Sequence, residues 1–351
     1  MSYPKILSIG YSVPPKSYTQ EEVWNALGYQ TSHFKRIFMG GEIQKRYLWI
    51  DPHKIRDLDW QGLQDEYLVG ATDLSAKSVR ACLDGHKADN IGCVVYVSCT
   101  GYLCPSVGHR IAPQFNFPSN ISFTSILGMG CEGGYPGLMR AKDYVVANGK
   151  PALVIATELS TCTFFKEDGG VPDSDHDYEV LRANAIFADA SVCALVGYDN
   201  DPRHPYIVDT ENYFVPDYLE DLGFVWSKGR LRVRLTRRVP ELAAVVTGVA
   251  TRRLLDRNNL GLSDIPWMII HAAGSRVLDN IRDYLGVPER KMALSRSVLR
   301  DFGNCSSTTI GLIGKRLMDQ NVQPGDWVLV VSVGPGMVGG ATLLRFPGGG
   351  E

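Results

Sequence analysis

The segment that decides the fold of this chain reads Gly128-Met129-Gly130-Cys131-Glu132-Gly133-Gly134. It places a thiol among glycines directly before a stretch that we expect to be helical, 134–148. A second segment, Asp301-Phe302-Gly303-Asn304-Cys305-Ser306-Ser307, stands in the same way before an apolar stretch, 306–320. Glycine allows sharp turns and the close approach of a ligand. Two such helix starts, far apart in the sequence, indicate a repeated unit with polar groups at equivalent corners.

The surroundings of the two segments support a repeat. An apolar strand at 92–98 precedes the first segment, and strands at 152–156 and 191–196 follow it. The second segment is preceded by a strand at 267–270 and followed by strands at 327–331 and 341–344. Further helices are expected at 69–84, 240–257 and 275–285. The alternation predicts an α/β protein with two duplicated halves, 1–200 and 201–351. A pseudo-twofold axis between the halves would bring Cys131 and Asn304 together at the centre.

Composition narrows the class of protein. The chain has 351 residues, 44% of them hydrophobic and 21% charged, with a formal net charge of −2. This suits a globular protein with a full core and offers no basic surface for nucleic acid. No run approaches the roughly 18 apolar residues of a membrane span, and the N-terminus lacks a signal-peptide apolar region. We therefore expect a cytoplasmic protein. An acidic, turn-rich segment at 164–183 is expected to be an exposed excursion.

Cysteine and histidine usage predicts no metal site. The eight cysteines form no CxxC pair, and the seven histidines show no HExxH-type spacing. Cysteines inside apolar runs, such as Cys93 and Cys193, are expected to be buried free thiols in a reducing compartment.

Three residues at strand or helix ends carry the chemistry. We interpret Cys131 as a nucleophile, because a thiol at a helix N-terminus near an imidazole is biased toward the thiolate. Its neighbour Glu132 would act against this. His271 directly follows a buried strand, where α/β folds place ligands. An imidazole N–H and the amide of Asn304 could together hold a developing enolate or oxyanion. The alternatives are a structural cysteine, a core histidine and a plain helix cap.

A papain-like cysteine hydrolase uses the same residue types. The sequence lacks the CGSCW-like surround of that class, and its cysteine lies mid-chain in a duplicated α/β pattern. The segment Ser332-Val333-Gly334-Pro335-Gly336 could be mistaken for a phosphate loop, but it lacks the GK[ST] ending.

Five segments, which follow one another along the chain, carry a family resemblance that spans essentially its whole length. The sequence resembles the chalcone-synthase-like, or type III, polyketide synthases of the thiolase superfamily. The matching segments are Ile43-Gln44-Lys45-Arg46-Tyr47, Gly130-Cys131-Glu132-Gly133-Gly134, Phe187-Ala188-Asp189-Ala190, Gly303-Asn304-Cys305-Ser306-Ser307 and Val333-Gly334-Pro335-Gly336.

The resemblance implies five αβαβα layers, a homodimer, and coenzyme A or phosphopantetheine thioesters as substrates, with no separate cofactor. Acyl-CoA and malonyl-CoA would be the small-molecule partners. Cys131 would carry the acyl group, and His271 and Asn304 would stabilise the enolate formed when a malonyl unit loses CO2. The remaining residues that match substrate-binding positions are Phe187 at the passage to the cavity, Ser306, Ser160 and Thr163 on the cavity wall, and Cys104, which would reach into the partner subunit's cavity.

Departures from the plant pattern shift the expected substrate. Arg36 matches one member of the family's basic cluster for the CoA phosphates, while His33 and Gly40 stand where two lysines are expected. Arg276 could compensate. Val233 replaces an aromatic gatekeeper. We therefore expect a bacterial-type acyltransferase that takes an aliphatic starter or is loaded from an acyl carrier protein.

Two alternative functions follow from these observations. The first is a β-ketoacyl-carrier-protein synthase III-like enzyme, which catalyses a single condensation of carrier-bound substrates. The second, from a different class, is the papain-like hydrolase, which would act on peptides or amides without malonyl-CoA.

Overall fold

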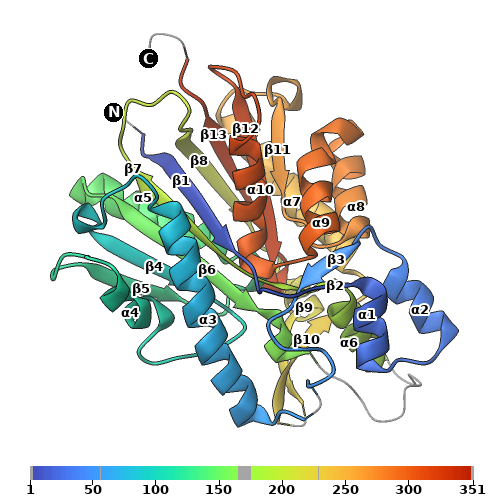
Figure 1. Ribbon diagram of the computed structural model, residues 1–351. Helices are drawn as coiled ribbons and strands as arrows, with labels where there is room; N and C mark the ends of the chain where they lie inside the picture. The colour runs from blue at the N-terminus through green and yellow to red at the C-terminus, as the bar shows by residue number, and fades with distance from the viewer. Residues whose placement is uncertain (1–2, 56, 165–174, 228, 349–351) are drawn as a thin grey trace.

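The computed structural model describes residues 3–348 apart from 56, 165–174 and 228. Within this part of the chain, nine strands form one mixed sheet (Figure 1). Their order is β11 (Trp267–Ile270), β12 (Trp327–Gly334), β13 (Val338–Arg345), β8 (Tyr206–Tyr213), β1 (Lys5–Ser12), β7 (Asp189–Gly197), β6 (Ala152–Leu159), β4 (Cys93–Val97) and β5 (Ser122–Ile126).

The strand directions repeat across the middle of this sheet. β1 is antiparallel to β7, β7 is antiparallel to β6, and β6 is parallel to β4. In the same way β8 is antiparallel to β13, β13 is antiparallel to β12, and β12 is parallel to β11. The two sets meet where Lys5 of β1 pairs with Tyr206 of β8. The duplicated halves expected from the sequence are therefore present.

Helices complete the layers (Figure 1). α3 (Trp60–Cys82) covers β1, β6 and β7, and α7 (Val239–Arg257) covers β8, β12 and β13. α5 (Gly134–Asn148) and α10 (Thr309–Met318) lie between the two sets of strands. α8 (Ser275–Leu285) packs against α7 on the outside. This arrangement is the expected five-layered αβαβα fold.

The inner helix α5 shows why the sequence folds this way. Tyr135 and Met139 are four residues apart, as are Ala141 and Val145, and all four are buried. Each pair lies on one face of the helix, and because Tyr135 and Ala141 point in different directions, the helix is buried on two faces. The helix ends at Gly149, whose φ of 65° is a left-handed conformation that glycine adopts without strain.

Most of the long elements match the sequence-based predictions. α5 and α8 have the expected bounds, whereas α3 begins at Trp60 rather than at residue 69. The stretch 306–320 is a 3-10 turn, Ser306–Thr308, followed by α10. The expected excursion at 164–183 lies partly outside the described residues, and its last part belongs to a helix, α6 (Asp175–Ile186).

Several elements were not predicted from the sequence. They are α1 (Gln20–Leu27), α2 (Ser32–Met39), α4 (Val107–Ile111), α9 (Ala293–Phe302), β2 (Ser17–Thr19), β3 (Lys45–Tyr47), β9 (Leu222–Ser227) and β10 (Arg230–Leu235), together with β1, β5, β8 and α6. Within the described residues, no helix is both long and apolar enough to cross a lipid bilayer.

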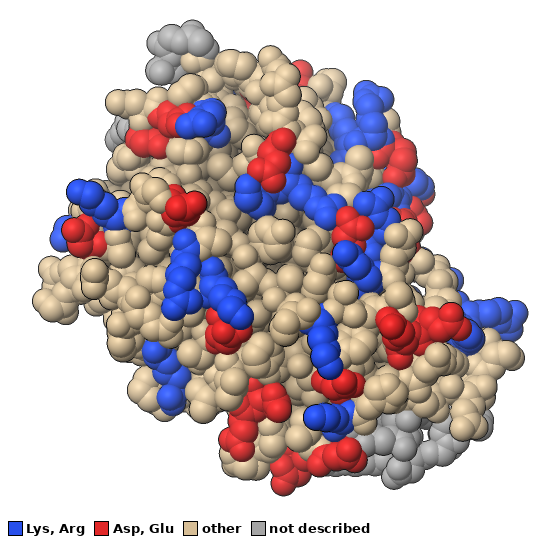
Figure 2. Space-filling model, viewed as in Figure 1, with Lys and Arg blue, Asp and Glu red and all other residues tan. Residues whose placement is uncertain are grey.

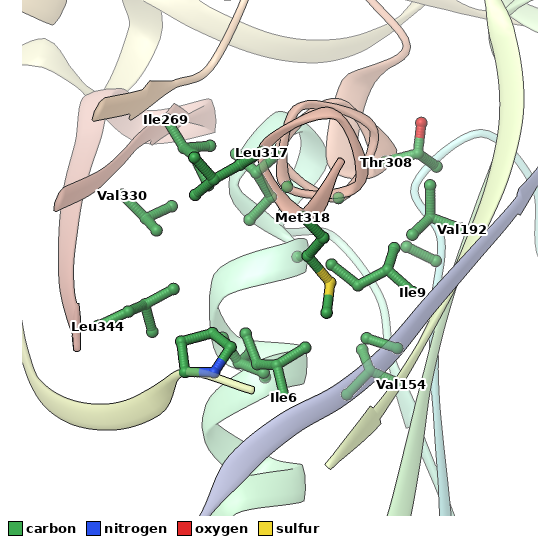
Figure 3. Close-up of a pocket in the computed structure, with 18 of the residues that line it drawn as sticks. Ile6, Ile9, Val154, Val192, Ile269, Thr308, Leu317, Met318, Val330 and Leu344 are labelled. Atoms are coloured by element: carbon green, nitrogen blue, oxygen red, sulfur yellow. The ribbon is translucent and has the colours of Figure 1, made fainter. Parts of the chain in front are cut away.

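An apolar cavity of about 90 Å³ lies where α5 and α10 meet the strands of both halves (Figure 3). Its wall includes Ile6, Val192, Ile269 and Val330, and α10 contributes Gly311 and Gly314. Cys131, His271 and Asn304 do not line it. Void space of this kind costs stability because the lining atoms lose packing partners.

Candidate active site

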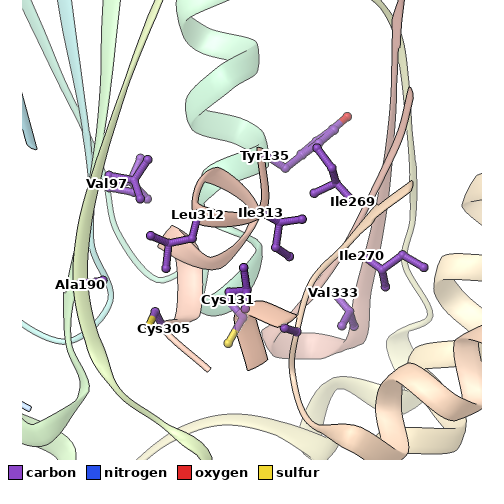
Figure 4. Packing of buried hydrophobic residues seen from close by; sticks show 14 of the residues in the cluster. Val97, Cys131, Tyr135, Ala190, Ile269, Ile270, Cys305, Leu312, Ile313 and Val333 are labelled. Atoms are coloured by element: carbon purple, nitrogen blue, oxygen red, sulfur yellow. The ribbon is translucent and has the colours of Figure 1, made fainter. Parts of the chain in front are cut away.

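Cys131 lies in a 3-10 turn, Gly130–Glu132, that leads into α5. Gly130 has a φ of 50°, and a Cβ there would lie 2.4 Å from Cγ of Pro335. Only glycine therefore lets this turn pass so close to the end of β12. The thiol is 8% exposed. Figure 4 shows it near the labelled apolar side chains Leu312 and Ile313 of α10, with the sulfur pointing away from them.

The backbone of Asn304 is fixed by a bridge to the segment before β7. Its N–H donates to the carbonyl of Ile186 at 2.8 Å, and its carbonyl accepts from the N–H of Ala188 at 2.9 Å. Its Oδ1 accepts from the N–H of Ser306 at 2.9 Å. Asn304 is not the cap of α10, because Thr308 holds that position.

His271 directly follows β11, and its backbone N–H donates to the carbonyl of Val331 at 2.9 Å. The residue is 1% exposed, and neither ring nitrogen has a hydrogen-bond partner among the described residues. Burial lowers the pKa of the imidazole to about 4. The ring is therefore neutral at physiological pH and has a free N–H to offer to a substrate oxygen.

The thiol of Cys131 meets both Ser306 and Asn304. The pKa of this thiol is raised to about 12, mainly by burial and to a smaller extent by the nearby Glu158, although hydrogen bonds with Ser306 and Asn304 act in the opposite direction. The thiolate expected from the helix start is therefore not favoured in this closed site, because desolvation outweighs the helix dipole.

The carboxylate of Glu132, which the sequence places beside the thiol, is directed toward β13, where a Cβ on Gly340 would lie 2.7 Å from Oε1. Both carboxyl oxygens are buried without a hydrogen-bond partner in the described structure, and burial raises the pKa of Glu132 to about 8.

A second carboxylate, Glu158, organises the floor of the site and was missed by sequence reasoning. It accepts from the N–H groups of Cys99 and Thr100 at 3.0 and 3.2 Å, and from the hydroxyls of Thr100 and Ser307. The Cys99 thiol lies 3.4 Å from the same carboxylate and 3.6 Å from Oγ of Ser306. A polar residue at the end of a buried strand was the available signal, since Cys99 and Glu158 occupy such positions.

A small cavity joins these groups. Six residues expected from the sequence line it, namely Cys131, Ser160, Thr163, Phe187, Val233 and Ser306. The β9–β10 hairpin adds Leu222 and Phe224, which the sequence did not indicate. The volume is about 20 Å³, enough for about one water molecule. The site is therefore closed in this conformation and must widen to hold an acyl chain.

Three expected substrate-binding residues lie outside this cavity. Arg36 on α2 and Arg276 in the first turn of α8 are exposed. The segment that follows α2 approaches α8, where Oγ of Ser275 accepts from the N–H of Glu42 at 3.0 Å. Cys104 is exposed on the loop before α4. Figure 2 shows basic side chains interspersed with acidic ones over this view of the molecule rather than gathered in one patch. Among the described residues, no group of three or more His, Cys, Asp or Glu could hold a metal ion.

Two family descriptions match the chain. Residues 4–200 match "Chalcone and stilbene synthases, N-terminal domain". Residues 255–346 match "3-Oxoacyl-[acyl-carrier-protein (ACP)] synthase III C terminal".

Individual relatives match along nearly the whole chain. The 3,5-dihydroxyphenylacetyl-CoA synthase of Amycolatopsis balhimycina is 25% identical and covers 97% of this chain and 93% of its own length. A chain described as a putative chalcone synthase of Bacillus subtilis is 27% identical, over 97% and 98%. The crystal structure of 1,3,6,8-tetrahydroxynaphthalene synthase from Streptomyces coelicolor superimposes with a TM-score of 0.89 at 24% identity, over 98% and 99%, and shows the same fold.

Proposed function

Since the chain belongs to the chalcone and stilbene synthase family, we propose that Cys131 accepts an acyl starter and that the chain is then extended by decarboxylative Claisen condensation with a malonyl thioester. The protein is a condensing enzyme of the transferase class, of the type III polyketide synthase family. The observation that carries the assignment of residues is the contact between Asn304 and the thiol of Cys131, which are 173 residues apart in the sequence (304 − 131). A hydrogen bond from Asn304 to Ala273 connects this pair to the loop that begins at the neutral His271.

In the loading step, the sulfur of Cys131 attacks the carbonyl carbon of an acyl thioester. The proton of the thiol goes to His271, whose imidazole is neutral and has no other partner in the described structure. The thiolate of coenzyme A, or of a phosphopantetheine arm, leaves and takes up that proton. The acyl group is then held on Cys131 inside a site from which water is largely excluded, which protects the thioester from hydrolysis.

In the extension step, the malonyl thioester loses CO2, and negative charge develops on its thioester oxygen. The imidazole N–H of His271 and the side-chain amide of Asn304 donate to that oxygen. The carbon of the enolate attacks the acyl carbonyl on Cys131, and the thiolate of Cys131 is released. Both donors are neutral, so they stabilise the developing charge without placing a buried cation in the resting site.

The small volume of the closed cavity favours a small aliphatic starter. Its wall carries Val233 where the plant pattern has an aromatic gatekeeper, but Phe224, the cross-strand partner of Val233, fills the space. Exposed Arg36 and Arg276 would contact the phosphates of coenzyme A. Two relatives support coenzyme A chemistry by name, since they are 3,5-dihydroxyphenylacetyl-CoA synthases.

A single condensation with carrier-protein substrates is the second candidate. The observation that favours it is the match of residues 255–346 to the C-terminal domain of 3-oxoacyl-carrier-protein synthase III. That region holds both His271 and Asn304. The two candidates differ in the number of malonyl units in the product and in the carrier of the donor. The papain-like alternative has no such support and is set aside.

We propose further that the protein works as a homodimer. β5 is the edge strand of the sheet, so its outer backbone groups are free to pair with a second copy. The same edge carries exposed apolar side chains, Tyr102 at 65% and Leu127 at 45% exposure. The exposed Cys104 lies on this side, where a partner's cavity wall could receive it.

The division of the chain into halves at residue 200, and a cytoplasmic location, remain proposals. The first is supported by the polar, proline-containing stretch 198–205 between β7 and β8, and the second by the eight free cysteines.

Mass spectrometry tests the function directly. Protein incubated with acyl-CoA or acyl-carrier donors should gain one acyl group, and Cys131→Ala should gain none. Addition of malonyl-CoA should then release products longer than the starter by one or more two-carbon units. An acyl adduct that persists in Cys131→Ala, or the absence of any malonyl-dependent product across the starter panel, would refute the proposal. Cys99→Ala, which removes the other thiol of the cavity, is the control for site-specific acylation.

A further inference from the structure

Arg46 is a fully buried cation that the proposed mechanism does not use. It is 0% exposed, and its guanidinium lies over the rings of Phe38 and Phe164, with centroids 5.6 and 5.9 Å away. Nε and Nη2 have no hydrogen-bond partner among the described residues. A buried, incompletely paired charge is costly, and an apolar side chain would fill such a site at lower cost. The position therefore calls for a role beyond packing.

The one nitrogen that is bonded, Nη1, holds a single segment of chain. It donates to the carbonyl of Asn184 at 2.7 Å and to the carbonyl of Phe187 at 2.8 Å. This segment ends α6 and leads into β7, and Phe187 lines the active-site cavity. Arg46 thus fastens the backbone directly beside a residue of the cavity wall.

The segment that Arg46 holds also forms the backbone hydrogen bonds of Asn304. Ile186 and Ala188 form the two backbone hydrogen bonds to Asn304, at 2.8 and 2.9 Å. From the other side, the methylene groups of Arg46 lie beneath the turn before Asn304. A Cβ on Gly303, whose φ is 76°, would lie 2.9 Å from Cγ of Arg46. The stem of the arginine therefore contacts the turn, while its head holds the segment to which Asn304 is bonded.

We propose that Arg46 is a positioning residue for Asn304 in the condensing reaction. It holds the 184–188 segment and the turn at Gly303 in a fixed position relative to each other, so that the amide of Asn304 stays directed at the thioester oxygen of the donor. The inference rests on the proposed function. A displacement of about 1 Å at a catalytic group can cost about 10²-fold in rate. Loss of Arg46 should therefore affect the step that depends on Asn304 more than the step that depends on Cys131 alone.

The test compares two half-reactions in purified protein. Arg46→Lys keeps the charge, but its ammonium nitrogen lies one bond short of the position of Nη1, and Arg46→Met keeps the approximate volume without donors. Intact-protein mass reports acyl transfer from an acyl-CoA to Cys131, and release of CO2 from malonyl-CoA reports decarboxylation. We expect decarboxylation to fall by about 10- to 100-fold in Arg46→Lys, with acyl transfer within about threefold of the unmodified protein.

Gln20→Leu is the matched control. Nε2 of Gln20 donates to the carbonyl of Ala185 at 2.8 Å, in the same segment, but Gln20 does not bond Phe187 or contact Gly303. It should leave the ratio of the two half-reactions unchanged, because the hydrogen bonds of Arg46 to the carbonyls of Asn184 and Phe187 still hold the segment. A second readout separates positioning from general loosening of the fold. The double variant Arg46→Lys with Asn304→Ala should decarboxylate no more slowly than Asn304→Ala alone, because Arg46 acts through Asn304.

The outcomes are distinguishable. Unchanged decarboxylation in Arg46→Lys, an equal loss of both half-reactions, or additive losses in the double variant would each overturn the inference while leaving the proposed function standing. If the unmodified protein does not decarboxylate malonyl-CoA with any starter, the proposed function itself fails, and the inference with it. Should Arg46→Met not fold, Arg46→Lys and the double variant decide the matter.

Discussion

The side-chain amide of Asn304 donates to the carbonyl oxygen of Ala273 at 3.3 Å. Ala273 lies two residues beyond His271, and its own N–H donates to the carbonyl of His271 at 2.8 Å. The amide therefore ties the turn after α9 to the loop after β11, and in the resting site it also hydrogen-bonds the thiol of Cys131. This bond connects two polar corners of the C-terminal half that the sequence places 33 residues apart (304 − 271).

The first prediction concerns the division of labour in this pair. Asn304→Ala should still accept an acyl group on Cys131, but should release CO2 from malonyl-CoA about 10²–10³-fold more slowly, because one donor to the enolate oxygen is lost. His271→Ala should impair both steps, since the imidazole also takes the proton of the thiol. Radiolabelled CO2 release and intact-protein mass measure the two steps. Undiminished decarboxylation in Asn304→Ala would show that Asn304 only stabilises the turn and does not take part in this step.

The second prediction concerns chain length. Phe224 stands opposite Val233 on the β9–β10 hairpin, and both line the cavity of about 20 Å³. Phe224→Ala should enlarge the cavity and shift the products toward one or more additional malonyl units, as measured by liquid chromatography with mass spectrometry. Trp226→Ala is the control on the same hairpin, because Trp226 is 65% exposed and packs against Trp60. An identical product spectrum in all three proteins would show that the hairpin does not limit extension.

The third prediction concerns pH. Burial raises the pKa of Glu132 to about 8, above its ordinary value of 4.5. Between these two values the folded state binds more protons than the unfolded state, so this residue lowers stability as pH rises from 4.5 to about 8. Glu132→Gln removes the titration and should be more stable than the unmodified protein by a few kcal/mol near pH 8.5, on the order of the shift in pKa. The difference should shrink toward pH 5.

Urea unfolding at pH 5.0, 7.0 and 8.5 measures this difference. Glu179→Gln is not a suitable control, since Glu179 pairs with Arg232 at 2.8 Å. The exposed Glu241→Gln on α7 serves instead. A stability difference for Glu132→Gln that does not grow with pH would contradict the assignment.

The fourth prediction uses the apolar cavity between the halves. Gly314 lines it on α10, and a Cβ there would meet Cδ1 of Ile9 at 3.2 Å and otherwise ordinary contacts. Gly314→Ala should stabilise the fold by about 1 kcal/mol through helix propensity and added packing. Gly311→Ala, one turn away on the same helix, should destabilise it by about 1–3 kcal/mol, because its Cβ would lie 2.5 Å from Cγ1 of Val192. Opposite signs in thermal unfolding are expected, and equal signs would refute this account.

The fifth prediction concerns assembly. Sedimentation at micromolar concentration should give a species of twice the 38.7 kDa chain mass. Replacement of Leu127, which is 45% exposed beside β5, by Lys should weaken the dimer by placing two like charges near the axis. Val146→Lys is the matched control, because Val146 is 60% exposed in the last turn of α5, and it should leave the dimer intact. A fully active 38.7 kDa species would exclude an obligate dimer.

The sequence by itself determined the layered architecture and the repeat. Long apolar strands and amphipathic helices have a local signature, because burial of a whole face imposes a period on the residues. The bounds of α5 and α8 and the central strands were predicted for that reason. The Gly-flanked Cys131, the strand-end His271 and the turn at Asn304 could be singled out because glycine and polar residues at such seams are conspicuous within one chain.

Only the tertiary structure decided the protonation states and the cavity wall. The helix start at Cys131 predicts a thiolate, yet burial favours the neutral thiol, since desolvation depends on every element packed around the sulfur. Phe224 reaches the cavity from a hairpin that the sequence did not indicate. Glu158 and Arg46 form hydrogen bonds with groups far away in the sequence, which for Arg46 are carbonyls 138 and 141 residues away. Such contacts arise when distant segments are brought together, and no local pattern of residues records them.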